Sequence, residues 1–362
     1  MTNSIAELVN KAKEAELETL VYAHCDHFEP FGVKRKDAEG NMDLIGLEHV
    51  RTWAERCRKN YHMAKATPFI LSRYLLERWS PTHPDNIVRA DEFMGFASWA
   101  CSKEDKDIIQ LLHKLGFETQ LHVHHENWTE SKRSGLGHDP ERDANRLKVY
   151  VQTTLDYLRD VTGEAYNEWF FVHGHWGLNA SDTSVCNIVN EIEVLKSLGC
   201  QGDFTFTAGR KWCNPEINVP HAINPCTGEK SYASEEANPL ILSENAKVLT
   251  PDRFLIWASP IHYFYLSLEN IVKRGFGVYD VVDKWLNAAS IGNFGFVKTH
   301  AHSMNPVFWS GEKETTTPML SPNVLSALDL LAEVCEQAGI NYLPASVPEL
   351  YQILKKLDGE TV

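Results

Sequence analysis

Four short runs of histidine are the groups in this chain best suited to chemistry. The sequence has 16 histidines, and nine of them lie in these runs. A neutral imidazole is a common metal ligand, and histidine is the side chain whose ordinary titration lies nearest neutral pH. The runs therefore predict a metal site or a site of proton transfer. Their members are His24, His27, His122, His124, His125, His173, His175, His300 and His302.

The first run lies in TLVYAHCDHFEPF, residues 19–31. Because strand side chains alternate between two faces, His24 and Asp26 share a face and could act as metal ligands or as a catalytic base beside a metal. His27 and Glu29 flank the pair and are expected to contact substrate. The competing interpretation is a polar strand end at which Asp26 caps the turn.

The second run, FETQLHVHHENW at residues 117–128, gives the strongest signal. His122 and His124 share a face at strand spacing, and further polar groups follow in the turn. Four candidate metal ligands come from these two runs: Asp26, His122, His124 and Glu126. His125 and Asn127 are expected to contact substrate.

The third run, EWFFVHGHWGLN at residues 168–179, predicts substrate contacts from His173, His175 and Trp176, since an aromatic ring can stack on a sugar. A packed corner is the alternative.

The fourth run, FVKTHAHSM at residues 296–304, offers His300 or His302 as a general acid or a last metal ligand. Asp203, on a further strand, could orient an imidazole near the substrate or simply lie in a turn.

Positioning these groups requires an alternation of strands and helices, which the hydrophobic periodicity predicts. A strand-then-helix alternation repeated about seven times indicates a parallel sheet, either closed as a barrel or open and doubly wound. The predicted strands are 20–23, 69–72, 117–123, 169–173, 202–206, 254–259 and 294–299. The predicted helices are 47–65, 103–115, 141–161, 186–198, 267–289 and 323–338.

Two observations favour the barrel. The chain has neither G-x-G-x-x-G nor G-x-x-x-x-G-K, the loops by which open sheets bind nucleotides. The histidine runs also fall at the carboxyl ends of separate strands, where barrel enzymes place their active sites. We therefore predict one (β/α) barrel domain over residues 1–362, with an inserted excursion at about 209–251 that covers the mouth.

Charge and composition exclude several partners. With 35 basic and 49 acidic residues the net charge is −14, which argues against nucleic acid and anionic membranes as partners. We find no apolar run that predicts a signal peptide or a membrane span, and the eight cysteines form no C-x-x-C pair. The composition predicts a cytoplasmic protein with reduced thiols, and a homo-oligomer is compatible with it.

The motifs H-x-D-H-F-E-P, H-x-H-H-E-N, H-G-H-W and K-T-H-A-H resemble the polysaccharide deacetylase-like proteins of the NodB-homology superfamily, over roughly residues 24–302. The resemblance implies a distorted (β/α) barrel of about seven parallel strands. It also implies one divalent metal held by an aspartate and two histidines, and removal of N- or O-acyl groups from sugars.

Asp26 and His122 match family positions, and His300 or His302 corresponds to the family's general acid. This chain departs from the pattern at two ligand positions. Glu126 stands where the family has a second histidine, so Glu126 or His124 would take that place. His27 stands where the second of two paired aspartates is expected.

These features predict a metal-dependent, deacetylase-like hydrolase that acts on a sugar or surface-glycan precursor, as in O-antigen or exopolysaccharide biosynthesis. Histidine and carboxylate ligands favour zinc, although other divalent metals fit the composition. One alternative is a metal-dependent glycoside hydrolase, which needs two carboxylates across the sugar. The other is a barrel that binds a glycan or a metal without turnover.

Overall fold

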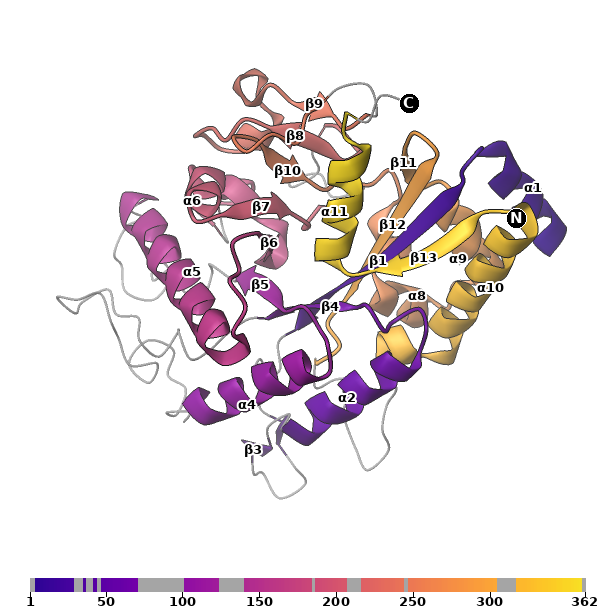
Figure 1. Cartoon of the computed structure of the whole chain (residues 1–362), viewed down its shortest axis with the longest axis horizontal. Helices are drawn as coiled ribbons and strands as arrows, with labels where there is room; N and C mark the ends of the chain where they lie inside the picture. Colours follow the sequence, from indigo (N-terminus) through magenta and orange to yellow (C-terminus); the bar gives the residue numbers. More distant parts are fainter. Residues whose placement is uncertain are drawn as a thin grey trace.

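The computed structural model describes residues 4–28, 35–36, 42–43, 47–70, 101–123, 140–183, 186–206, 216–243, 247–304 and 317–359. They form an α/β fold built on one strongly curled, half-barrel sheet, with most helices packed around its outside (Figure 1). Five residues singled out from the sequence lie outside the described residues: Glu29, His124, His125, Glu126 and Asn127.

Seven parallel strands make up the centre of the sheet, and each corresponds to a strand predicted from the sequence. Their order across the sheet follows the order of the chain except for the last, which pairs with the first. In that order they are β12 (Phe294–Ala301), β1 (Thr19–Phe28), β4 (Thr67–Ile70), β5 (Gln120–Val123), β6 (Trp169–His173), β7 (Cys200–Asp203) and β10 (Phe254–Ile256).

The sheet is mixed, so the prediction of a purely parallel barrel was incomplete. At one edge β11 (Ala289–Ile291) runs antiparallel to β12; at the other, β8 (His221–Ile223) and β9 (Leu240–Ile241) continue antiparallel from β10. A further strand, β13 (Asn341–Ala345), pairs in parallel with the first half of β1. No pairing within the described ranges joins β9 to β11 and closes the sheet. Strands of two or three residues carry too little alternation for sequence periodicity to detect.

Helices follow most strands, as predicted, with three differences. The predicted helix 267–289 is divided, because Gly275 ends its first part with a left-handed φ of +62°. The predicted helix 186–198 begins later, and two helices near the chain ends were not predicted. The helices are α1 (Ile5–Glu14), α2 (Leu47–Lys59), α4 (Cys101–Lys114), α5 (Pro140–Thr162), α6 (Glu191–Ser197), α7 (Tyr263–Leu266), α8 (Leu268–Arg274), α9 (Val278–Trp285), α10 (Pro322–Ala338) and α11 (Val347–Leu357). A separate two-stranded sheet pairs β2 (Arg35–Lys36) with β3 (Met42–Asp43).

Strand alternation divides the core into an outer and an inner layer. Leu20 and Tyr22 of β1 belong to the outer layer, between the sheet and the surrounding helices. Val21 and Cys25 belong to the inner layer, where side chains of α11 also pack. Because α11 follows β13, which pairs with the first half of β1, it fills the end of the half-barrel at which the strands begin. The carboxyl ends of the strands remain for polar groups.

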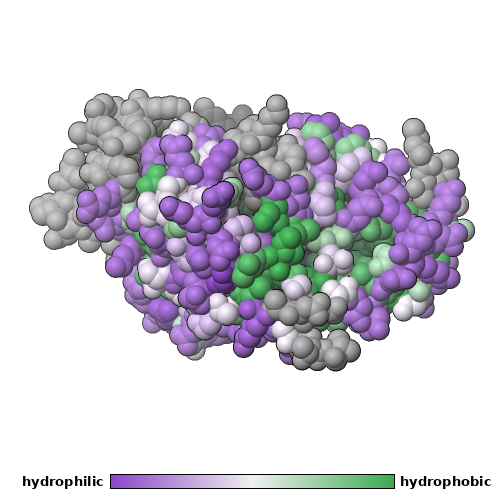
Figure 2. All heavy atoms as spheres, turned by 90° about the horizontal axis from the view of Figure 1, so that it is seen from above, coloured by the Kyte–Doolittle hydropathy of each residue, from purple (hydrophilic) through white to green (hydrophobic). Residues whose placement is uncertain are grey.

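Part of the predicted excursion extends the sheet. Within residues 216–243 it contributes β8 and β9, and further along the Asp358 carboxylate accepts the backbone N–H groups of Val248 and Leu249. On the face seen in Figure 2, hydrophilic residues surround a central group of apolar residues. No helix in the described part of the chain is both long enough and apolar enough to cross a membrane.

Gly202 tests the close packing of β7 against β10. A Cβ at this position would lie 2.7 Å from the Cβ of Leu255 and 2.9 Å from its carbonyl oxygen, so one of the strands must move. We expect Gly202→Ala to lower the free energy of unfolding by about 1–3 kcal/mol in chemical denaturation. Gly277→Ala is the control, since its Cβ would meet only the Asp280 carboxylate, at 3.3 Å. Equal stability of the two variants would contradict this packing.

Candidate functional site

Four histidines from three strand ends meet on the inner side of the sheet. His27 is at the centre, with its ring centroid 4.9 Å from that of His122, 5.6 Å from His300 and 4.7 Å from His302. They come from β1, β5, β12 and the residue that follows β12. We call these four residues the histidine cluster.

Strand register explains why these side chains converge. His27 pairs with Phe69 of β4, His122 with Val172 of β6, and Cys25 with His300 of β12. Residues paired across a sheet point to the same face, and Phe69, Val172 and Cys25 all belong to the inner layer. The histidines are therefore placed on the concave side, at the carboxyl ends where a parallel sheet presents its site.

Two of the buried histidines, His122 and His27, are suited to hold a metal. The Nδ1–H of His122 donates to the carbonyl of Val172 at 2.8 Å, which puts the imidazole lone pair on Nε2. Burial lowers the pKa of His27 well below its usual value, and the neighbouring histidines lower it further. Both rings are therefore suited to the neutral form in which histidine binds metals.

The charge of a buried lysine also lowers the pKa of histidines in the cluster. Lys298 lies two residues before His300 on β12, and its ammonium group donates to the carbonyl of Phe204. Burial, together with the charge of Lys298, lowers the pKa of His300 to about 3, so His300 is neutral at pH 7. Its Nδ1 is buried and has no hydrogen-bond partner within the described ranges. Lys298 is the lysine of the K-T-H-A-H motif, but no role was predicted for it from the sequence.

His302 has a different environment from the other three. Its Nδ1 lies 2.9 Å from a carboxylate oxygen of Glu269, which also accepts the backbone N–H of His302. Burial would raise the pKa of Glu269, but the hydrogen bond and charge of His302 outweigh it and lower the pKa to about 2. The ionised carboxylate orients the imidazole, whose side chain is 33% exposed and so remains open to proton exchange. Glu269 was not predicted, because it lies on α8 outside any motif.

His24 and Asp26 share a face, as predicted, and it is the opposite face from that of His27. His24 contacts the hydroxyl of Thr299 at 2.9 Å and the Asp26 carboxylate at 3.4 Å, and both of these partners lie on the outer face of the sheet. Asp26 also accepts the backbone N–H of Ser303 at 3.2 Å and the Ser303 hydroxyl. Since Ser303 follows His302, Asp26 helps to fix the segment that carries His302.

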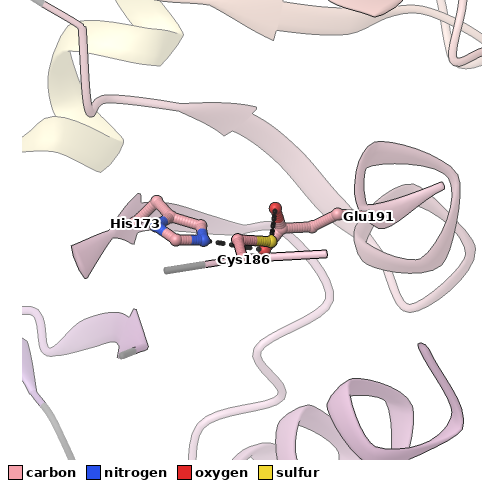
Figure 3. Close-up of side chains that lie close together, drawn as sticks. All are labelled: His173, Cys186 and Glu191. Carbon is pink, nitrogen blue, oxygen red and sulfur yellow. Dashed lines mark hydrogen bonds and ion pairs between the residues drawn. The ribbon is translucent and has the colours of Figure 1, made fainter. Parts of the chain in front are cut away.

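A second group of side chains lies on the outer side of β6. His173, at the end of β6, points toward Cys186 and toward Glu191, the first residue of α6 (Figure 3). The ligand atoms of these three buried residues all lie within 4.8 Å of one another, an arrangement that could hold a metal ion. We call them the mixed cluster. From the sequence, His173 was expected to contact substrate, and Cys186 and Glu191 had no predicted role.

The remaining predicted site residues lie outside both clusters. His175 is exposed with a left-handed φ of 52°, and the half-buried Trp176 packs against the outer core layer. Asp203 is buried at the end of β7 and accepts the N–H and the hydroxyl of Thr205, at 2.9 and 2.6 Å. The Thr205 oxygen in turn accepts the backbone N–H of His173 at 2.7 Å. Asp203 thus holds the backbone of His173, through Thr205.

The chain matches none of the known family models to which it was compared, and a search of curated proteins finds no match. The chemistry of these clusters must therefore be inferred from their geometry and from the motifs.

Asp203 should make the stability of the fold depend on pH. Burial raises its pKa from 3.8 to about 7, even though the Thr205 hydrogen bonds oppose the shift. The folded chain therefore binds this proton more tightly than the unfolded chain, and its contribution to stability is lost as the pH rises from about 4 through 7. We expect Asp203→Asn to gain stability relative to wild type over this interval, by as much as about 4 kcal/mol in urea denaturation.

The control for this titration is Glu336→Gln, which neutralises an exposed carboxylate on α10. Its stability relative to wild type should change little between pH 4 and 7. The assignment to Asp203 is wrong if the two variants show the same pH dependence.

Proposed function

We propose that this chain is a metal-dependent hydrolase that removes an acyl group from a carbohydrate, with one divalent metal bound at the histidine cluster. The convergence of His27, His122, His300 and His302 at the carboxyl ends of parallel strands carries the proposal. The substrate class and the closed, deacetylase-like barrel come from the resemblance of the histidine motifs, and they belong to the proposal as well.

His27 and His122 are the proposed metal ligands. The Val172 carbonyl fixes the tautomer of His122, in the way that carbonyl groups commonly orient the histidines of metal sites. His27 stands at the position that follows Asp26, where the resembled family has a ligand. His300, whose buried ring is neutral, is placed to take a further position. His124 and Glu126 remain candidate ligands from the sequence.

A divalent ion bound there would polarise the acyl carbonyl and make water a nucleophile near neutral pH. The protein would supply the proton transfers. His302 is the proposed acid and base, because it is the most exposed member of the histidine cluster and carries an ionised carboxylate partner. Asp26, through Ser303, positions the segment that presents His302.

Substrate selection would come from groups around the mouth of the half-barrel. The net charge of −14 repels anions in general, so the metal and the histidines must supply the attraction for the acyl carbonyl. A glycoside hydrolase would instead need two carboxylates facing the sugar. Asp26 and Asp203 are bound to Ser303 and Thr205, and Glu269 is bound to His302. Among the carboxylates within the described ranges, these contacts leave Asp26, Asp203 and Glu269 poorly placed for glycoside hydrolysis, which favours acyl hydrolysis.

The first functional prediction concerns the two proposed ligands. His27→Gln and His122→Gln should each lower the affinity for zinc and reduce acetate release from an acetylated amino sugar or oligosaccharide by at least about 100-fold. His62→Gln is the matched control, since His62 is a buried histidine held by Asp329 and Tyr342 away from the histidine cluster. Release of a reducing sugar in place of acetate would support the glycoside hydrolase instead.

The second functional prediction concerns Glu269 as a positioning residue. Glu269→Gln removes the negative charge that stabilises protonated His302, so the limb of the pH–rate profile that belongs to His302 should move to lower pH. We expect kcat to fall about 10- to 100-fold with little change in KM. Ser267→Ala, which removes a neighbouring hydroxyl that contacts Glu269 at 2.9 Å, is the control and should keep the profile in place. An unshifted profile in Glu269→Gln would show that the carboxylate does not act through His302.

A further inference from the structure

The mixed cluster has the composition and the spacing of a zinc site. His173 Nε2 lies 3.5 Å from one carboxylate oxygen of Glu191, and Cys186 Sγ lies 3.7 Å from the other. Ordinary zinc bond lengths in a tetrahedron place nitrogen and oxygen ligands about 3.4 Å apart, and sulfur and oxygen ligands about 3.6 Å apart. Each measured separation is close to that of a ligand pair around one ion, although the two involve different oxygens of Glu191. With one ligand atom taken from each residue, all three lie within 4.8 Å of one another.

The hydrogen bonds of His173 direct its lone pair toward the other two ligands. Its Nδ1 contacts the carbonyl oxygen of Gly174, which can only accept a hydrogen bond. The N–H of Gly177 lies 3.2 Å from this nitrogen and 3.3 Å from the same carbonyl, so the carbonyl can accept it. Nδ1 then carries the hydrogen of the neutral ring, and the lone pair is on Nε2, facing Glu191.

Glu191 is held as a carboxylate ready to accept a cation. Its Oε2 accepts the backbone N–H of Asn179 at 2.7 Å. Asn179 is itself fixed, because its side-chain amide donates to the carbonyls of Val189 and Gly228. An imidazole lone pair, a thiol and a carboxylate thus face one another in a fully buried space. A zinc ion bound there would release the thiol proton, which Cys186 donates to Glu191, to solvent, and the thiolate and carboxylate would then offset the charge of the ion.

We propose that His173, Cys186 and Glu191 provide three of the ligands of a structural zinc ion, separate from the metal at the histidine cluster. The two sites lie on opposite sides of the sheet. Val172 pairs with His122 on the inner face, and His173, the next residue, points to the outer face. This inference stands on the geometry of the mixed cluster alone and does not depend on the proposed function.

The ion would join β6, Cys186 and α6, and the turn that follows β6 has a strained backbone. His175, Trp176, Asn179 and Ala180 all have left-handed φ values, between 51° and 58°. Such conformations persist only where surrounding contacts hold them. A zinc ion between β6, Cys186 and α6 would fix this turn. It would also fix the end of β6, where the Val172 carbonyl orients His122.

Cobalt substitution of the full chain tests the proposal. A Co²⁺ ion bound to a thiolate gives a sulfur-to-metal charge-transfer band, which nitrogen and oxygen ligands do not give. Wild-type protein whose metal has been removed with a chelator should develop this band when it is titrated with Co²⁺, at about one equivalent per site. Cys186→Ser should abolish the band and lower the bound zinc by about one ion per chain. Absence of the band in wild-type protein would overturn the proposal, whether or not any variant folds.

Two further variants identify the ligands. Cys25→Ser is the matched control, because Cys25 is an equally buried free thiol, on the inner face two residues from His27. It should keep the band. Loss of the band in Cys25→Ser instead of in Cys186→Ser would assign the thiolate to Cys25, beside the histidine cluster, and would overturn the proposal. Glu191→Gln keeps the shape of the side chain and should weaken Co²⁺ binding at least 10-fold. Unchanged binding in Glu191→Gln would also contradict the site.

Thermal unfolding gives an independent readout. A chelator should lower the Tm of wild-type protein by more than that of Cys186→Ser, because the variant has only the metal of the histidine cluster to lose. An equal shift in both proteins would overturn a structural role. Loss of hydrolysis with an intact thiolate band would count against the proposed function alone.

Discussion

The pairing of β1 with β12 is the constraint on which the arrangement of polar groups depends. Eight consecutive residues of β1 pair with β12 in parallel, so the last strand of the predicted alternation returns to lie beside the first. This pairing places His300 next to Cys25 and His302 just beyond Asp26. Because side chains alternate along β1, one strand end serves both faces, with His27 directed inward and His24 and Asp26 directed outward. The inner face then receives His122 from β5.

Burial determines what these groups can do once they have been brought together. It lowers the pKa of His27 and His300, and the charge of Lys298 beneath them acts in the same direction. The inner histidines are therefore neutral donors of electron pairs. His302 differs, because Glu269 favours its protonated form and solvent reaches its ring. One cluster thus offers groups suited to bind a metal and a group suited to transfer protons, and a single residue, Ala301, separates His300 from His302.

Much of the sheet was predictable, because its seven parallel strands are apolar runs that alternate with long amphipathic helices. The convergence of three of the four histidine runs was predictable for the same reason, since parallel strands end at the same edge. The third run was expected to join them, but His173 lies on the opposite face, in the mixed cluster. Alternation also indicated that His24 and Asp26 share a face, but a fully buried strand does not reveal which face is the inner one. The α11 helix did carry a detectable signal, a capping box between Ser346 and Glu349. Glu269, Lys298 and Glu191 had no predicted role, although Lys298 belongs to the K-T-H-A-H motif, since their roles arise from contacts between segments distant in sequence.

The central claim is that a metal binds at the histidine cluster on the inner face of the half-barrel. The most direct measurement is an anomalous-difference map at the zinc edge from crystals grown with zinc. We expect a peak about 2.0–2.1 Å from the Nε2 atom of His122 and from a ring nitrogen of His27. A map with no peak in bonding contact with either His27 or His122, from crystals saturated with zinc, would contradict the account.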